Sequence, residues 1–554
     1  MFQLSPGVNV SEIDLTTVVP AVSTTAGAFA GQFQWGPVNK RTLITHETML
    51  VDRFNKPNDN CATSWFSAAN FLAYGNNLQV VRAANTASNN STSGVNTVLV
   101  QNEDVYDAAF SANNLGTYGT YVARYPGGLG ASLNVSVCSG NTYFSTWKYA
   151  SNFTSAPNTS TYVTNAGGAY DQMHIAVVDE DGLFTGTKGT VLEVFPFVSK
   201  ATNALNDDGS TAYYRNVIRE QSKYVYAFGA NNGSWDGPAT TSFTVVANAD
   251  ASLTGGTDRA LTDGDIQVGY DQFSNADLVD ISLVVTGAAS NTVQKYVISN
   301  VSSARKDCIA FISPPRASVV NNAGDETTDI AAWLSTVNIY SSYAFADSGW
   351  KYQYDKYNNI YRWIPLNGDI AGLCVRTDDT RDPWFSPAGF SRGAIKNVVK
   401  LAWNPNQAER DALYSGAVNP VVSFPGQGTV LYGDKTLLTQ PSVFSRINVR
   451  RLFIVLEKAI ATASKYSLFE LNDEFTRSQF VALVEPFLRD VKGRRGIYEY
   501  RVVCDTTNNT AAVIDANKFV GDIYIKPARS INFIQLNFVA VQSGVNFTEV
   551  VGAI

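Results

Sequence analysis

Residues 279–313 read VDISLVVTGAASNTVQKYVISNVSSARKDCIAFIS, and this stretch determines the class of fold. Residues 279–285 are rich in β-branched side chains and stop at Gly287, which predicts a buried strand. A helical segment is expected over 293–300, and 308–313 predicts a second strand that ends before two prolines. This order favours two parallel strands joined by a crossover helix, and therefore an α/β domain.

A second α/β stretch lies near the start of the chain. Residues 60–75 carry apolar side chains at helical spacing, and 78–82 predicts a short strand. We expect both stretches to belong to one domain, made of 23–88 plus 256–345.

The segment between these stretches predicts a β-rich insertion at 89–255. Residues 119–255 contain short runs in which apolar and polar residues alternate with period 2, which is typical of strands. Residues 86–118 are rich in Asn, Ser and Thr and predict a loop. A surface loop tolerates such an insertion because its closure entropy grows slowly with length.

The last third of the chain predicts an α+β domain at 346–528. Amphipathic helices are expected over 446–465 and 480–491, the second with Pro486 as a kink. A shorter helix is expected after Asn404 as its cap residue and Pro405 in the first helical position. Strands are expected over 498–503, 511–514 and 521–526.

Extended arms are expected at both ends, over 1–22 and 529–554. Residues 8–13 mix β-branched and polar side chains, as a short strand does, yet nothing nearby in sequence can pair with them. Their backbone groups must find partners far away or in another molecule. A frayed terminus is the alternative.

Composition excludes several classes of protein. The 554 residues predict three or four domains, and an apolar fraction of 45% rules out wholesale disorder. A net charge of −7 argues against a nucleic-acid binder, which needs a basic face. No apolar run approaches the length of a membrane span, and the first residues do not resemble a signal peptide. We therefore expect a protein that is made and kept in a cytoplasm.

Neither a metal site nor a cofactor motif is predicted. The five cysteines lie far apart without a CxxC pair, and we expect them to be small buried apolar residues. The two histidines, His46 and His174, are expected to be structural. Gly255-Gly256 lacks the lysine of a phosphate loop, and the acidic pairs are too short for a calcium loop. We expect no cofactor, no metal and no enzymatic activity.

Two features leave alternatives open. Aromatic residues crowd 350–363, where a sugar-binding platform is conceivable but a strand pair with cross-strand packing is favoured. Carboxylate pairs for glycoside cleavage stay open, because such partners can be far apart in the chain. Basic residues form clusters that predict either a solvated face or one side of an electrostatic contact between subunits. These residues are Arg446, Arg450, Arg451, Arg494 and Arg495.

Several motifs together resemble the tail sheath proteins of contractile-tailed bacteriophages. The strongest match is NVRRL at 448–452, which leads into the two helices. The others, in chain order, are SPGVNVSEI at 5–13, RYPGGLGASL at 124–133, YDKYN at 354–358, YRWIP at 361–365, and the stretches 384–389, 404–420 and 428–437. The resemblance covers the N-terminal arm, a short piece of the insertion and nearly all of 346–554. Residues 86–118 and 200–255 match nothing in the family.

The resemblance implies a mechanical function without a cofactor. It implies stacked six-membered rings around a tail tube, which contract on a baseplate trigger and drive the tube through the host envelope. The partners would be other copies of the chain, the tail tube protein, and the baseplate and tail terminator proteins, with no nucleic acid and no membrane insertion. The protein would be assembled in the bacterial cytoplasm and reside in the virion.

The family also implies that terminal arms add strands to the C-terminal domain of a neighbouring subunit, which agrees with a strand that has no local partner. Residues 15–23 and 527–530 would then be hinges. The residues expected in the added strands are Val8, Val10, Glu12, Ile13, Ile531, Phe533, Leu536, Phe538, Val545 and Phe547. The arginines at 446–451 are expected at a surface that faces either another subunit or the tube.

Two other functions stay open from the sequence. One is the sheath of a bacteriocin-like or secretion-type contractile injection system. The other is a β-rich, glycan-binding tail component, for which the aromatic residues and the β-rich insertion would account.

Overall fold

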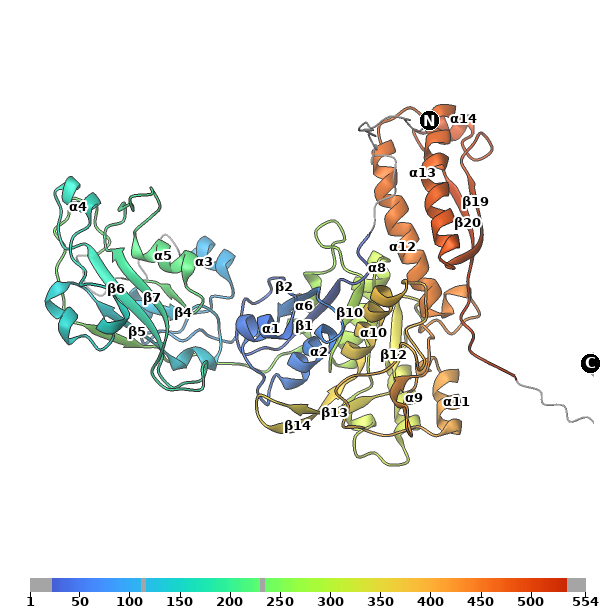
Figure 1. Cartoon of the computed structure of the whole chain (residues 1–554), viewed down its shortest axis with the longest axis horizontal. Coiled ribbons are helices and arrows are strands. Elements are labelled where there is room, and N and C mark those ends of the chain that lie inside the picture. The colour runs from blue at the N-terminus through green and yellow to red at the C-terminus, as the bar shows by residue number, and fades with distance from the viewer. Residues whose placement is uncertain (1–21, 111–115, 230–234, 536–554) are drawn as a thin grey trace, which may run out of the picture.

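The computed structural model describes residues 22–110, 116–229 and 235–535 and shows an elongated chain (Figure 1). The β-rich insertion lies at one end, a mixed α/β body occupies the middle, and a helical hairpin stands at the other end.

A seven-stranded sheet forms the body, in the order β16-β12-β11-β10-β1-β3-β2. All neighbouring strands are parallel except β2, which runs antiparallel to β3. Leu283 of β10 lies opposite Ile309 of β11, so the strand, helix, strand prediction is confirmed. The strands are β1 (Gly27–Gly31), β2 (Thr42–Ile44), β3 (Leu78–Arg82), β10 (Leu283–Val285), β11 (Ile309–Ile312), β12 (Ala344–Asp347) and β16 (Val418–Asn419).

Helices cover both faces of this sheet, and a separate apolar cluster lies on each face. A buried parallel sheet needs such cover on both sides. On one face lie α1 (Glu47–Phe54), α2 (Ala62–Leu72) and α10 (Asn367–Thr380). On the other face lie α6 (Asp263–Asp271), α7 (Asn291–Tyr296) with a π-helix (Val297–Ser302) and α8 (Ser303–Arg305), α9 (Glu326–Val337) and α11 (Gln407–Ser415).

Helices α2 and α10 pack closely at Gly368. A Cβ atom built on this glycine would lie 2.3 Å from the backbone oxygen of Ser67. The absence of a side chain therefore permits the approach of the two helices.

The insertion contains the expected strands. Its four-stranded antiparallel sheet has the order β7-β6-β5-β9, and β4 pairs with β8. Residues 103–109 form a helix, although the sequence predicts a loop there, because Asn102 caps the amide of Val105. The elements are α3 (Glu103–Ala109), β4 (Tyr121–Ala123), β5 (Leu133–Cys138), α4 (Thr161–Ala166), β6 (Gln172–Asp179), β7 (Thr190–Ser199), α5 (Tyr214–Gln221), β8 (Val225–Ala227) and β9 (Ala249–Ser252).

The aromatic stretch at 350–363 forms the expected antiparallel strand pair. Tyr354 lies opposite Tyr361 and Tyr352 opposite Trp363, with ring centroids 5.2 Å and 4.7 Å apart. The favoured interpretation is thus confirmed. The small strands of this region are β13 (Trp350–Asp355), β14 (Ile360–Pro365), β15 (Lys400–Leu401), β17 (Val421–Phe424) and β18 (Gly428–Leu431).

The C-terminal unit is a helical hairpin with a two-stranded ribbon. It comprises α12 (Ile447–Ser464), α13 (Glu474–Gly493), β19 (Ile497–Val503), α14 (Ala511–Asp515) and β20 (Asp522–Pro527). The multidomain α/β and α+β fold class is therefore confirmed.

Three local expectations differ from the structure. Residues 511–514 are helical, because a short apolar run does not distinguish strand from helix and alanines favour the helix. The cap of α11 is Asn406 instead of Asn404, because Asn406 and Glu409 form a reciprocal capping box. The expected domain limit between 345 and 346 falls within β12, and β16 and α10 from beyond it complete the body.

Candidate intersubunit surfaces

The β19–β20 ribbon has one face packed against α13 and one face open. Tyr500 lies opposite Ile525 and Val502 opposite Ile523, and these four side chains are partly buried against the α12–α13 cluster. Tyr524 on the opposite face is 60% exposed. The alternation follows from the period of a strand, and it presents the ribbon as a two-stranded sheet covered on one side.

Both outer edges of the ribbon are open. Among the described residues, β19 pairs only with β20, and β20 only with β19. Each strand therefore has a row of backbone N–H and C=O groups that face away from its partner. Such edges are sites at which another strand can add.

The C-terminal extension begins after β20. Ala528 donates its amide to Gly496, and 528–535 then runs on without regular structure. Ile531 and Phe533 are each 83% exposed. The other residues expected in the arms lie outside the described residues, namely Val8, Val10, Glu12, Ile13, Leu536, Phe538, Val545 and Phe547.

Arg450 and Arg451 are buried within the subunit. The guanidinium of Arg450 lies over the ring of Phe444, 4.0 Å from its centroid, and burial lowers the pKa of this arginine. Arg451 pairs with the carboxylate of Asp378 on α10 and donates to the backbone oxygen of Cys374. Burial raises the pKa of Asp378 even though Arg451 lies beside it. These contacts tie α12 to the α/β body.

The other three arginines are more accessible. Arg446 donates to the hydroxyl of Tyr414 at 2.7 Å and is partly exposed. Arg494 pairs with Asp382 at the foot of α13 and stacks over a tryptophan ring. Arg495 is exposed, and its side chain forms no hydrogen bond or ion pair with any described residue. The two basic clusters of the sequence thus have different surroundings.

An exposed apolar surface lies at the turn between α12 and α13, which we call the hairpin tip. Its side chains are 63% to 105% exposed and number Tyr466, Leu468, Phe469, Leu471 and Phe475. Soluble monomers rarely expose so many apolar side chains together, which indicates a surface that a partner covers. The sequence signal was apolar residues in a connection that is normally polar, and our sequence reasoning missed it.

Comparison with known proteins identifies the family. A model of the phage tail sheath protein central domain matches residues 260–437, and a model of the phage tail sheath C-terminal domain matches 439–540. The tail sheath protein of Vibrio phage KVP40 is 35% identical over 671 residues, and that of Enterobacteria phage T4 is 36% identical over 668 residues. Each alignment covers 100% of both chains. The chain belongs to the phage tail sheath proteins.

Family membership confirms the main prediction from the sequence, that of a structural component of a contractile phage tail. The aligned lengths exceed the 554 residues of this sheath protein, so the two relatives contain segments that it lacks.

Solved structures share the fold. The sheath tail protein of Listeria innocua is 11% identical, with a TM-score of 0.55, across 92% of this chain and 93% of that one. The helical sheath of the anti-feeding prophage in its contracted state is 13% identical, with a TM-score of 0.52, across 97% of this chain and 99% of that one.

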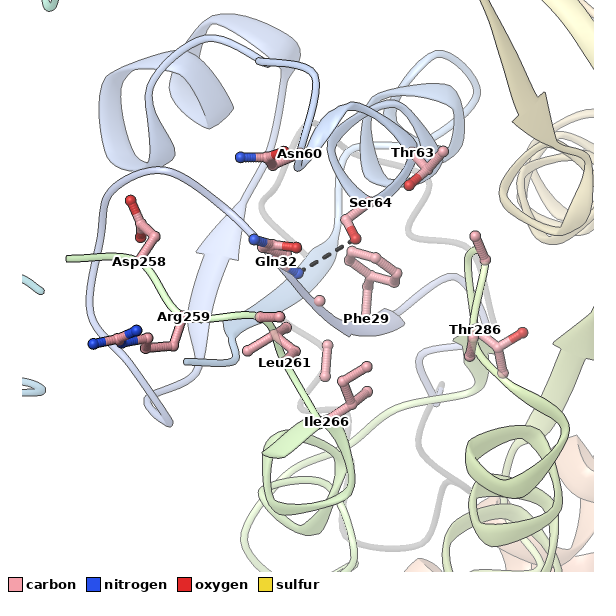
Figure 2. Close-up of a pocket in the computed structure, with 15 residues that line it drawn as sticks. Phe29, Gln32, Asn60, Thr63, Ser64, Asp258, Arg259, Leu261, Ile266 and Thr286 are labelled. Carbon is pink, nitrogen blue, oxygen red and sulfur yellow. Dashed lines mark hydrogen bonds between the residues drawn. The ribbon is translucent and has the colours of Figure 1, made fainter. Parts of the chain in front are cut away.

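The sheath protein also has a cavity of about 460 Å³ at the carboxyl ends of β1 and β10 (Figure 2). Open α/β sheets bind their ligands at such a position. Of the described residues that line it, Asp258 and Arg259 are the charged ones, and Asp258 already accepts from the amide of Gly128. Figure 2 shows the amide of Gln32 directed at the hydroxyl of Ser64 on α2.

Several titratable groups are buried in structural positions. Burial raises the pKa of Asp347 to about 8, although Ser313 and the amide of Gly349 donate to its carboxylate. His174 is buried, with one ring nitrogen near the oxygen of Ser155 and the other accepting from the amide of Phe197. It is therefore a structural histidine, as expected.

All five cysteines are buried and unpaired, as expected. Among the described residues, no cluster of His, Cys, Asp or Glu could hold a metal ion, and no helix is long and apolar enough to span a membrane.

Proposed function

We propose that this sheath protein polymerises as stacked six-membered rings around a tail tube and contracts to drive the tube through a host envelope. The observation that carries the proposal is the β19–β20 ribbon, whose two outer edges are unpaired among the described residues. A subunit whose sheet is open on both sides can accept one strand from each of two neighbours.

The arms at 1–22 and 529–554 are proposed to supply these strands. One added strand along the six residues of β20 would form about six backbone hydrogen bonds. At about 0.5–1.5 kcal/mol net for each bond, one arm would contribute about 3–9 kcal/mol. Linkages of this strength would hold neighbouring subunits together while their bodies rotate during contraction.

The exposed surfaces of the C-terminal unit are proposed to face neighbours or the tube. The hairpin tip supplies apolar area, and Arg446, Arg494 and Arg495 supply accessible positive charge. Arg450 and Arg451, by contrast, form their contacts inside the subunit. The work of contraction would come from surface that becomes buried between subunits, without an enzymatic step.

The domain division that we propose retains the limits expected from the sequence. Residues 23–88 with 256–345 and residues 89–255 would form the α/β and outer domains, and 346–528 would form the inner domain. The shared sheet and the separate clusters of the insertion support the first two units. The remaining proposals are baseplate and terminator proteins as partners at the ends of the sheath, assembly in the host cytoplasm and residence in the virion.

Deletion of residues 1–14 tests the proposal. The full-length chain is expected to form hollow tubes in negative-stain electron microscopy over a range of protein and salt concentrations. The truncated chain is expected to stay a soluble monomer. Regular tubes from the truncated chain would contradict the role of the N-terminal arm.

A matched pair of variants separates strand addition from a general effect of charge. In a strand, Val8 and Val10 share one face and Asn9 and Ser11 share the other. We expect Val8→Lys/Val10→Lys to abolish tubes and Asn9→Lys/Ser11→Lys to retain them. Equal loss in both pairs would show that added charge, rather than a buried strand face, is responsible.

A further inference from the structure

The root of the C-terminal extension is attached to a buried carboxylate of the body. Ser530 donates its hydroxyl to one carboxylate oxygen of Asp434 at 2.7 Å, and Asn532 donates its amide group to the other at 3.0 Å. Asp434 is 1% exposed, and Ser530 and Asn532 lie about a hundred positions later in the chain. Two successive polar side chains of an otherwise exposed segment thus converge on one group.

The carboxylate of Asp434 is itself held in place. The hydroxyl of Tyr414 donates to it at 3.2 Å, and the guanidinium of Arg446 lies 3.4 Å away. Arg446 also donates to the same tyrosine hydroxyl, and the backbone oxygen of Asp434 accepts from the amide of Ile447. The carboxylate is therefore a fixed acceptor, and fixed acceptors restrict the groups that donate to them.

This node joins the two units that the family models separate. Asp434 and Tyr414 lie in the central unit, which is matched up to residue 437, whereas Arg446, Ser530 and Asn532 lie in the C-terminal unit, which is matched from 439. The side chains between and beyond the two donors point away from the body, since Ile531 and Phe533 are each 83% exposed and Ile534 is 77% exposed.

We propose that Asp434 is a clamp that sets the direction in which the C-terminal extension leaves the subunit. Hydrogen bonds from Ser530 and Asn532 fix the polar side of the extension on the body. The apolar side, with Ile531 and Phe533, is thereby presented to a second copy of the chain. This inference rests on the proposed function, in which the extension reaches a neighbour, and it adds the residue that aims it.

The clamp can be released without a change to the buried residues. The double variant Ser530→Ala/Asn532→Ala removes both donors and leaves Asp434 with Tyr414 and Arg446. Because the native cysteines are all buried, an Ile534→Cys substitution provides one accessible thiol for a nitroxide spin label. A label at Val95→Cys in the distant insertion, where the native side chain is 96% exposed, reports any general loosening of the chain.

In the free full-length subunit, we expect the spectrum of the label at 534 to shift from slow to fast motion in the double variant. The label at 95 is expected to stay unchanged, and Ser530→Thr, which retains the hydroxyl, is expected to keep the label at 534 slower than in the double variant. In negative stain, the double variant is expected to lose regular tubes.

An unchanged spectrum at 534 would overturn the clamp, and so would regular tubes from a variant whose label is released. Failure of the wild-type chain to form tubes under any condition would count against the proposed function instead. In that case the comparison of label mobility in the free subunit would still decide whether Asp434 holds the extension.

Discussion

Removal of Arg451 tests whether this arginine acts within the subunit or between subunits. Arg451 and Asp378 are the buried partners that connect α12 to α10, with side chains that are each 5% exposed. Arg451→Ala would leave the carboxylate of Asp378 buried without its cation. Loss of one partner of a buried ion pair costs about 3–5 kcal/mol, because the remaining charge is uncompensated. One oxygen of Asp378 already lacks a hydrogen-bond partner among the described residues, so no second donor offsets the loss.

Hydrogen exchange measured by mass spectrometry on the free subunit gives the required readout. The backbone hydrogen bonds of α12 protect its amides, and we expect the free energy of opening of this helix to fall by about 3–5 kcal/mol in Arg451→Ala. Arg495→Ala is the matched control, and it is expected to leave protection unchanged because that side chain is exposed. Native protection in Arg451→Ala together with a loss of tubes would refute the reasoning and place Arg451 at a subunit contact.

Three further predictions concern the surface, the pH dependence and the helix packing. Phe469→Ser/Leu471→Ser should leave the melting temperature unchanged but raise the critical concentration for tube formation at least about tenfold, because burial of one such side chain is worth about 1.5–3 kcal/mol; unchanged sedimentation of polymer would contradict this. The pKa of Asp347 is raised from about 4 to about 8, so its contribution to stability is fully present below pH 4 and is lost as the pH rises toward 8. Urea unfolding of Asp347→Asn from pH 4 to 8 should therefore lack that decline, and a parallel decline in both proteins would contradict the assignment. Gly368→Ala should lower the free energy of unfolding by about 1–3 kcal/mol in urea unfolding, because its methyl group would meet the backbone of Ser67; a stabilised variant would show that the helices move apart freely.

The sequence predicts the body of this protein well, because its signals there are local and repeated. The stretch at 279–313 has a strand, helix, strand pattern with strong apolar runs, and β10 and β11 lie side by side as parallel strands. The aromatic pairs of β13 and β14 follow from alternation alone. The short run at 511–514 failed because four apolar residues do not define a period.

Surfaces were harder to predict, since the sequence records charge but not burial. Arg450-Arg451 and Arg494-Arg495 are both pairs of adjacent arginines next to an apolar helix. The first pair is buried and the second is largely exposed. The difference depends on Asp378 and Phe444, which come from other segments of the chain, so no inspection of the local sequence could have revealed it.

The position of the buried arginines on their helix explains why they need partners inside the subunit. Both lie in the first turns of α12, where the helix dipole disfavours positive charge. The carboxylate of Asp378 offsets this effect at Arg451, and the aromatic rings over Arg450 offset it at that position. Charges that are already compensated within the subunit have little left to offer a neighbour. The contacts between subunits must then depend on groups that remain unpaired, which are the ribbon edges, the hairpin tip and Arg495.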